Sequence, residues 1–371
     1  MKVLICGGGT GGHIFPALAA VSSLKRMGLI GEDFLWIGSA GQIEESLIPR
    51  AGLTLETISA GPIVGVSLLT KMMNASKLAW SLGTANRIIG RFKPDVLLMT
   101  GGYVNVPVAI IAKLRRIPAL IYLPDIEPGL AIRRLSRLAD AVAATADASK
   151  KFFQDGKVVV TGYPVRESLR QALALDKAAA LAEFDLQPGR RTVLVTGGSR
   201  GARSINRALM RILPQLLDSF QIIHLSGTLD WAEVEANARE LAEDHRAYYR
   251  PYPFLHERIG AAFRSADVVV ARAGASMLGE CPAFGLPAIL VPYPYAWRYQ
   301  KVNADYLAER GAAMTLVDER LTEELLPTLI DLLADDERLA RMSAAARNLS
   351  VFDAEDRLAQ AVRGLAQRGT R

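Results

Sequence analysis

Short apolar runs alternate along the chain with longer segments in which apolar residues recur at helical spacing. The first run, residues 2–6, is followed by glycines, by a helical pattern over 14–27 and by a second run at 34–37. Further runs lie at 95–99, 119–122, 141–144 and 158–160. This alternation is typical of a parallel sheet whose strands are connected by crossover helices. We therefore predict an α/β domain in the first half of the chain.

The same pattern restarts in the second half. A helical stretch runs from about 165 to 184, and Gln187-Pro188-Gly189 predicts a turn. Strands are then expected at 192–196, 221–225, 267–271 and 288–291. A helix is expected at 204–217, and a last helix at 354–367. The restart predicts two similarly built α/β halves with a boundary near residues 161–166.

Composition excludes several classes of protein. The 371 residues are 50% hydrophobic and 22% charged, so the chain can form two sizeable cores and is not disordered. Two cysteines, Cys6 and Cys281, and four histidines predict neither a disulfide framework nor a metal site. The apolar run at 3–6 is too short for a signal peptide, and no run reaches the ~18 residues of a spanning helix. We expect a cytosolic protein whose membrane contact is confined to its surface.

The positive charge is unevenly distributed. The formal net charge is +6, which permits nucleic acid, an anionic membrane or a phosphorylated small molecule as partner. Residues 1–163 contain 18 Lys and Arg against 11 Asp and Glu, a net +7, and the rest of the chain has a net charge of −1. The excess charge therefore belongs to the first half.

The first glycine-rich stretch, Gly7-Gly8-Gly9-Thr10-Gly11-Gly12-His13, lies between an expected strand and an expected helix. Glycines allow a tight turn and let backbone N–H groups approach an anionic or sugar ligand. A turn without a ligand is one alternative. A dinucleotide site is another, although Trp36-Ile37-Gly38-Ser39 lacks the acidic residue that binds ribose. His13 could accept a proton from a hydroxyl, or make structural hydrogen bonds only.

Two more glycine-containing turns follow strands in the second half. In Thr196-Gly197-Gly198-Ser199-Arg200-Gly201-Ala202-Arg203, N–H groups and the Ser199 hydroxyl would bind a diphosphate at a helix start. Neither this loop nor the first has the GxxxxGK[ST] pattern of a P-loop. After the strand at 267–271, Glu280 lies in a helix where it could bind a ribose or simply be solvated. Gln300 and Asn303 present amides that suit sugar hydroxyls.

Six segments, in this order and spacing, resemble the GT-B glycosyltransferases and, among these, the MurG family. They are GGGTGGHIFPALA at 7–19, KPDVLLMTGGYVNVP at 93–107, GYPVR at 162–166, GGSRGARSIN at 197–206, ADVVVARAGASMLGE at 266–280 and GLPAILVPYPYAWRYQKVNA at 285–304. The resemblance implies an α/β GT-B fold of two Rossmann-like, doubly wound parallel-sheet domains facing a cleft. An acceptor and membrane-associated domain would span 1–163, with a helix at about 351–367 packing back on it, and a UDP-sugar domain would span 164–350.

The activity implied by the resemblance is inverting hexosyl transfer without a metal or other cofactor. N-acetylglucosamine would move from UDP-N-acetylglucosamine to undecaprenyl-diphosphate-linked N-acetylmuramoyl-pentapeptide, converting lipid I to lipid II in peptidoglycan synthesis. This reaction belongs to cell wall biogenesis, cell shape and cell division. No nucleic acid partner is expected. The protein would work peripherally, at the cytoplasmic face of the cell membrane.

The resemblance also implies roles for individual residues. His13 would be the catalytic base, assisted by Tyr103. The transferred sugar and acceptor would meet Thr10, Gly11, Gly12 and, on the acceptor side, Asp125. The donor's diphosphate, uridine and sugar would meet Arg166, Ser199, His256, Ala275, Ser276, Met277, Leu278, Gly279, Glu280, Gln300 and Asn303.

The chain departs from the family pattern on the acceptor side. The family usually has His-Glu-Gln-Asn where this chain has Tyr122-Leu123-Pro124-Asp125, and Ile132 stands at a later family Asn. Tyr299 replaces the usual His or Gln before the last motif. A related UDP-sugar transferase with another lipid or a small-molecule acceptor is therefore an alternative. A UDP-sugar 2-epimerase and a non-catalytic UDP-sugar-binding protein are the others.

Residues 62–80 mix bulky apolar side chains with two lysines. Such a segment can pack as a core helix. With the resemblance and the charge of the first half, we expect it instead to dock shallowly on an anionic membrane surface. Arg115, Arg116, Arg133, Arg134 and Arg137 would add electrostatic attraction.

Overall fold

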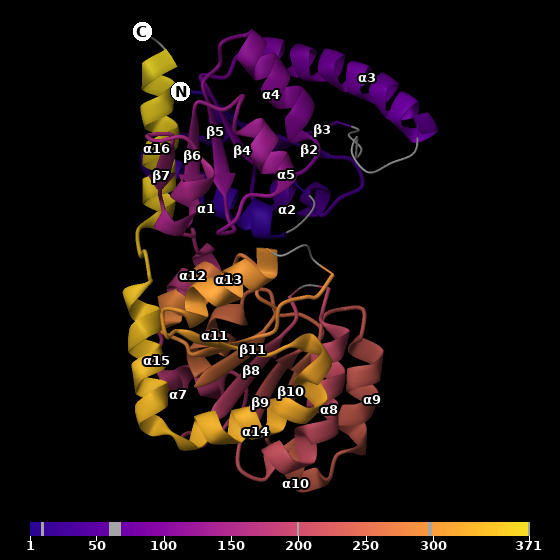
Figure 1. The fold of residues 1–371 in the computed structure, drawn as a ribbon, viewed down its shortest axis with the longest axis vertical. Coiled ribbons are helices and arrows are strands. Elements are labelled where there is room, and N and C mark those ends of the chain that lie inside the picture. Colours follow the sequence, from indigo (N-terminus) through magenta and orange to yellow (C-terminus); the bar gives the residue numbers. More distant parts are fainter. Residues whose placement is uncertain (9–10, 59–67, 199, 296–298, 370–371) are drawn as a thin grey trace. The chain divides into compact units, whose positions relative to one another are not determined.

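Residues 1–8, 11–58, 68–198, 200–295 and 299–369 are described by a computed structural model, with the backbone alone for 68–79 and 369. Two compact units divide the chain. The first, unit 1, is Met1–Pro164 with Asp353–Arg371, and the second, unit 2, is Val165–Phe352. Each unit is a parallel sheet with helices on both faces (Figure 1). The expected α/β architecture of two doubly wound parallel-sheet domains is confirmed.

The sheet of unit 1 has seven strands in the order β3-β2-β1-β4-β5-β6-β7, all paired in parallel. Their bounds are β1 Val3–Gly7, β2 Phe34–Ser39, β3 Thr54–Ile58, β4 Val96–Gly101, β5 Ala119–Leu123, β6 Ala141–Ala144 and β7 Val158–Val160. The central strands β1, β4 and β5 are buried along their whole length, because helices cover both faces. Chain order reverses between β1 and β4, and open α/β sheets bind ligands at this switch point.

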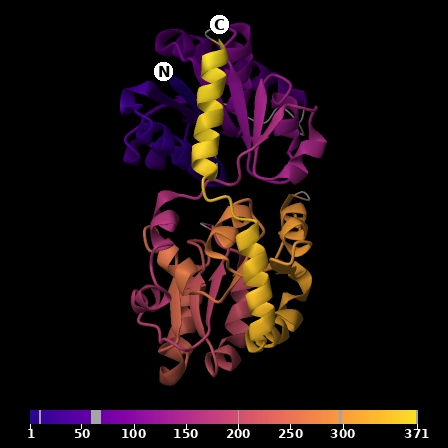
Figure 2. The ribbon, with the colours of Figure 1, turned by 90° about the vertical axis from the view of Figure 1, so that its left-hand side faces the viewer.

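Helices cover unit 1 on both faces. They are α1 Gly11–Arg26, α2 Glu44–Arg50, α3 Leu68–Phe92, α4 Asn105–Leu114, α5 Leu130–Leu135 and α16 Ala354–Gly369, with short 3-10 turns η1 Gly31–Asp33 and η2 Asp147–Phe152. Although α16 ends the chain, it packs on α1 and on the sheet of unit 1 (Figure 2). The carboxylate of Asp356 accepts hydrogen bonds from Ser23 Oγ and Arg26 Nη2, each 2.6 Å long. These bonds join the two helices beside their shared apolar core.

Unit 2 repeats this arrangement with six parallel strands in the order β10-β9-β8-β11-β12-β13. The strands are β8 Thr192–Thr196, β9 Gln221–Leu225, β10 Tyr249–Tyr252, β11 Val268–Ala271, β12 Ala288–Leu290 and β13 Ala313–Thr315. The helices are α6 Glu167–Ala172, α7 Lys177–Ala182, α8 Arg203–Leu217, α9 Trp231–Glu240, α10 Glu243–Arg246, α11 Ile259–Ser265, α12 Met277–Phe284, α13 Tyr299–Ala308, α14 Leu321–Ala334 and α15 Asp336–Asn348, with η3 Asp318–Arg320. Chain order reverses between β8 and β11, which gives this unit its own switch point.

Two differences from the expected elements have a clear physical reason. The helical stretch at 165–184 is two short helices, because Asp176 caps the second by accepting the N–H of Ala179 at 2.6 Å. Strands β3, β10 and β13 were not expected. All three are edge strands, and unlike the edge strand β7 they lack the fully apolar run that marks a predictable strand.

Among the described helices, none combines the length and the apolar character needed to cross a bilayer.

Candidate functional site

The glycine loop of unit 1 leads from the carboxyl end of β1 into α1, at the switch point beside β4. Gly7 lies directly against β4, where a β-carbon at residue 7 would be 2.0 Å from Thr100 Oγ1. The indole N–H of Trp36 donates to the Gly7 carbonyl at 2.9 Å. Close packing against β4 therefore requires glycine at residue 7. Thr10 lies outside the described residues, whereas Gly11 and Gly12 begin α1.

His13 lies in the first turn of α1, and its ring faces the loop after β4. A β-carbon at Gly101 would be 2.9 Å from ring atoms Nε2 and Cδ2. Gly101 and Gly102 have φ angles of +130° and +94°, a region that favours glycine. The amide of Asn105 holds this turn by donating to the Gly101 and Gly102 carbonyls. The two glycine motifs of the first half are thus brought together around His13.

The environment of His13 sets its charge. Desolvation lowers the pKa of its imidazole below the usual 6.5. The negative charges of Asp125 and Glu44 and a hydrogen bond to the Gly8 backbone act in the opposite direction but do not reverse the shift in pKa. The ring is therefore neutral at neutral pH and can accept a proton.

Tyr103 and Asp125 follow the neighbouring strands β4 and β5. Tyr103 is 53% exposed. In the segment that departs from the family pattern, Tyr122 is fully buried, and its hydroxyl lies 3.1 Å from Thr145 Oγ1. Burial raises the pKa of Tyr122. Asp125 is the residue of this segment that is partly exposed. Tyr122, which departs from the family pattern, is thus a residue of the core.

The second glycine loop connects β8 to α8 at the switch point of unit 2. A β-carbon at Gly201, which has a φ of +85°, would lie 2.1 Å from the carbonyl oxygen of Ser226. The Gly198 N–H donates to Thr196 Oγ1 at 3.2 Å, which fixes the start of the loop. The loop ends at α8, a helix of 15 residues whose first N–H groups can bind an anion. Ser199 lies outside the described residues.

Strand β11 neighbours β8, and the turn at 272–276 connects it to α12. Ala275 and Ser276 end this turn, and Met277, Leu278 and Gly279 form the first turn of the helix together with Glu280. Glu280 is buried, and its Oε1 lies 3.2 Å from Nη2 of Arg166. Two residues that were predicted to bind the sugar donor, Arg166 and Glu280, therefore form an ion pair with each other.

The two amides of α13 bind backbone groups of unit 2. Gln300 Oε1 accepts the N–H of Tyr293 at 2.8 Å. Asn303 is 1% exposed and donates from Nδ2 to the carbonyl of Ala273 at 3.2 Å. The Asn303 side chain thus stabilises the turn before α12. His256 follows the edge strand β10, is exposed and packs edge-on against Phe254.

A network of polar contacts around Arg272, after the carboxyl end of β11, was not expected from the sequence. Arg272 follows β11 and pairs with Asp318, and its Nη2 donates to Ser204 Oγ at 2.7 Å. Ser204 Oγ in turn donates to Asp318 at 2.7 Å. The guanidinium also lies 5.2 Å from the ring centroid of Tyr293. Arg272 thereby connects the start of α8, the turn before α12 and the segment before α13.

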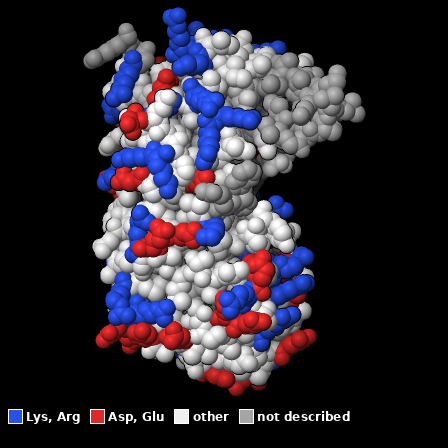
Figure 3. Space-filling view, in the orientation of Figure 1, with Lys and Arg blue, Asp and Glu red and all other residues white. Residues whose placement is uncertain are grey.

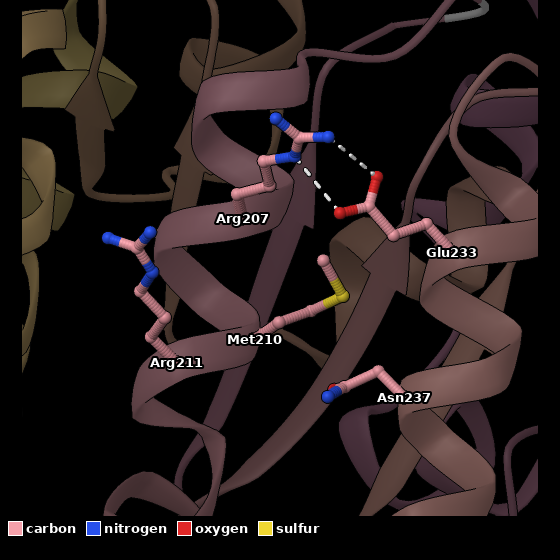
Figure 4. A pocket seen from close by; sticks show the side chains of 5 residues that line it. All are labelled: Arg207, Met210, Arg211, Glu233 and Asn237. Atoms are coloured by element: carbon pink, nitrogen blue, oxygen red, sulfur yellow. Dashed lines mark hydrogen bonds and ion pairs between the residues drawn. The ribbon is translucent and has the colours of Figure 1, made fainter.

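A hollow on the surface of unit 2 lies between α8 and α9 (Figure 4). Arg207 and Glu233 form two hydrogen bonds there, 3.0 and 3.3 Å long, beside Met210, Arg211 and Asn237. An exposed ion pair of this kind contributes little free energy. None of the predicted site residues lines this hollow. Across the described part of the chain, no cluster of three or more His, Cys, Asp or Glu is suited to a metal ion.

Both halves of the chain match models of the same protein family. Residues 3–144 match the glycosyltransferase family 28 N-terminal domain, and 192–358 match the family 28 C-terminal domain. A Roseiflexus protein named UDP-N-acetylglucosamine--N-acetylmuramyl-(pentapeptide) pyrophosphoryl-undecaprenol N-acetylglucosamine transferase is 37% identical, over 97% of this chain and 94% of its own.

Solved structures extend the comparison. The crystal structure of Acinetobacter baumannii MurG has a TM-score of 0.76 and 26% identity, and the match covers 98% of this chain and 99% of that one. A UDP-GlcNAc 2-epimerase from Neisseria meningitidis, at 16% identity and a TM-score of 0.67 over 98% of this chain and 100% of its own, shares the fold alone. The chain is thus a glycosyltransferase with the GT-B fold, and it belongs to glycosyltransferase family 28.

Proposed function

We propose that this enzyme transfers N-acetylglucosamine from UDP-N-acetylglucosamine to a polyprenyl-diphosphate-linked N-acetylmuramoyl-pentapeptide, with inversion at the anomeric carbon. The observation that carries the proposal is the position of His13, a neutral imidazole held against Gly101 at the switch point of unit 1. The name of the Roseiflexus relative supports the choice of donor and acceptor. In this proposal unit 1 receives the acceptor and unit 2 binds the donor.

The proposed chemistry is a single displacement. His13 takes the proton of the attacking acceptor hydroxyl as its oxygen bonds to the anomeric carbon, and the bond to the UDP oxygen breaks. Tyr103 follows β4, the strand next to β1, and Asp125 follows β5, the strand beyond it. Both contact the acceptor sugar in this proposal. Thr10, Gly11 and Gly12 provide loop contacts to the transferred sugar. The negative charge of Asp125 supports an imidazole that becomes protonated during the reaction.

The leaving diphosphate acquires negative charge, and unit 2 provides the groups to stabilise it. Backbone N–H groups before α8 and the Ser199 hydroxyl bind the phosphates, with Arg166 adding positive charge. Glu280 accepts hydrogen bonds from the ribose, exchanging part of its contact with Arg166 for the ligand. The turn at 275–279 lines the uridine, and His256 lies at its outer end. Gln300 and Asn303 lie on the side of this binding site that holds the sugar of the donor in this proposal.

A lipid-linked acceptor requires the enzyme to approach a membrane, and we place this contact on unit 1. Trp80 on α3 is 77% exposed and Leu114 on α4 is 75% exposed. Lys113, Arg115 and Arg116 are also exposed beside Leu114. Basic side chains also cover part of unit 1 in the face shown in Figure 3. Apolar and basic groups together favour shallow docking to anionic lipid. Peripheral binding at the cytoplasmic face of the membrane follows as part of this proposal.

The direct test combines radiolabelled UDP-N-acetylglucosamine with a short-chain lipid I analogue. We expect the wild type to transfer the label, and His13→Ala to lose roughly 10²- to 10⁴-fold in kcat. His245→Ala, a histidine of unit 2 that pairs with Asp218, is the matched control and should keep full activity. Absence of transfer by a wild type that binds UDP would refute the acceptor assignment. Formation of a 2-epimer without acceptor would identify an epimerase instead.

A further inference from the structure

Glu44 is a buried carboxylate beside the proposed catalytic site with no role in the mechanism above. It is the first residue of α2, and its side chain is fully buried. Its Oε1 accepts the N–H of Ser39, at the end of β2, over 2.9 Å. Burying a carboxylate is costly unless fixed hydrogen bonds compensate for its lost hydration. A glutamate in this position therefore needs a structural or functional reason.

The carboxylate of Glu44 is packed against two glycines. A β-carbon at Gly8, in the loop after β1, would lie 1.8 Å from Oε1. A β-carbon at Gly38, on β2, would lie 2.6 Å from Cγ. The side chain thus fills the space that these two glycines leave between the first glycine loop and β2. Moving the carboxylate would remove the support of the loop at Gly8.

Glu44 also acts electrostatically on groups of the site. Burial raises the pKa of Cys6 on β1, and the negative charge of Glu44 raises it further. Burial lowers the pKa of His13 on α1, and the charge of Glu44 opposes that shift. Asp125, after β5, provides the other negative charge that acts on the His13 ring. The Gly8 backbone, against which Glu44 packs, is itself hydrogen-bonded to this ring. Glu44 is therefore connected to His13 both through the loop and through its charge.

We propose that Glu44 is a positioning residue, which holds the glycine loop against the end of β2 and thereby orients His13 for proton transfer. This inference rests on the proposed role of His13 as the base. Glu44 itself does not contact substrate in this proposal. Its effect is transmitted through Gly8 and through the charge that it places beside the imidazole.

The test follows the His13 ring by NMR titration of the substrate-free enzyme, with the His13→Ala variant used to assign its signal. Glu44→Gln keeps the size of the side chain and an acceptor for Ser39, but removes the charge. We expect the pKa of His13 to fall further and kcat to fall roughly 10- to 100-fold, with the affinity for UDP unchanged. The acidic limb of the pH–rate profile should move to lower pH, because the ring then stays neutral to lower pH.

Glu45→Gln is the matched control. Glu45 is the next residue, is exposed and accepts the N–H of Gly41 at 2.9 Å. The Glu45→Gln substitution should leave the pKa of His13 and kcat unchanged. Gly8→Ala is a second variant in case Glu44→Gln does not fold, because the added methyl group displaces the carboxylate without removing its charge. It should alter the His13 titration and lower kcat.

Two outcomes would overturn the inference. The first is an unchanged His13 titration in both variants, and the second is a loss of stability or activity while the ring titrates as in the wild type. The titration needs no turnover, so it is independent of the proposed function. If His13→Ala retains activity, the role of the base fails, and the titration still reports whether Glu44 acts on the ring.

Discussion

The ring of His13 lies so close to Gly101 that a β-carbon at residue 101 would be 2.9 Å from its Nε2. The two residues come from different strand ends, since His13 lies in the first turn of the helix after β1 and Gly101 ends β4. Glycine at residue 101 leaves the space that the imidazole occupies. We expect the geometry of this contact to decide whether the ring can point toward an acceptor.

Gly101→Ala should therefore displace His13. Its methyl group would collide with the ring, and alanine is strained at a φ of +130°. We expect kcat to fall roughly 10- to 100-fold because proton transfer depends on alignment, while UDP affinity is unchanged. Steady-state kinetics and calorimetric UDP titration measure the two quantities. Gly83→Ala, on the exposed part of α3 with open space around it, is the control and should behave as the wild type.

Asp125→Asn should change the pH dependence of transfer. The negative charge of Asp125 raises the pKa of His13, so its removal lowers that pKa further. A base must be neutral to act, and the acidic limb of the kcat profile should shift to lower pH. The profile is measured between pH 5 and 8, with Asp147→Asn, on an exposed turn, as the control. An acidic limb at the same pH in both variants and the wild type would argue against the effect of Asp125 on His13.

Glu280→Gln should weaken UDP binding. The substitution removes the charge that pairs with Arg166 at 3.2 Å and that would accept the ribose hydroxyls. Hydrogen bonds to a charged group contribute about 1.5–3 kcal/mol, which corresponds to a loss in affinity of roughly 10- to 100-fold. Calorimetry measures the Kd, and Glu309→Gln on the surface of unit 2 should leave it unchanged. An unaltered Kd for Glu280→Gln would exclude the ribose role.

His224 should make unit 2 less stable in acid. Burial lowers its pKa from 6.5 to about 3, and its ring nitrogens bond the Tyr249 hydroxyl at 2.7 Å and Asn206 Oδ1 at 2.9 Å. The unfolded chain binds a proton at higher pH than the folded one. The free energy of unfolding is therefore highest above pH 6.5 and falls as the pH drops toward 3.

Urea unfolding between pH 5 and 8 measures this slope. His224→Gln should flatten it, by an amount on the order of 1 kcal/mol per pH unit, since a full proton difference corresponds to about 1.4 kcal/mol per unit. The exposed His256, replaced by Gln, is the control and should leave the slope as in the wild type. A slope that persists in His224→Gln would assign the acid sensitivity to other groups.

Local sequence pattern was sufficient for much of this protein. Buried strands of parallel sheets are continuous apolar runs, so β1, β4, β5, β8 and β11 could be predicted from residue type alone. The glycine loops were visible for the same reason, because a strand, a glycine turn and a helix start are consecutive in the chain. Edge strands such as β3 were missed because their half-exposed faces resemble ordinary loop sequence.

Tertiary structure decided the contacts between residues far apart in the chain. Arg166 and Glu280 are 114 residues apart, and Arg272 and Ser204 are 68 apart. Their pairing depends on strand order and on the direction of each side chain. Neither can be read from local hydrophobic periodicity.

The sequence by itself determined the two α/β halves and the glycine turns after their central strands, because each depends on neighbouring residues. Only the folded chain showed that Gly101 makes room for His13, that Glu44 fills the space beside Gly8, and that Asn303 binds the backbone at Ala273. The physical reason is that these contacts depend on space and charge, which are set by segments that meet only after the sheets have formed.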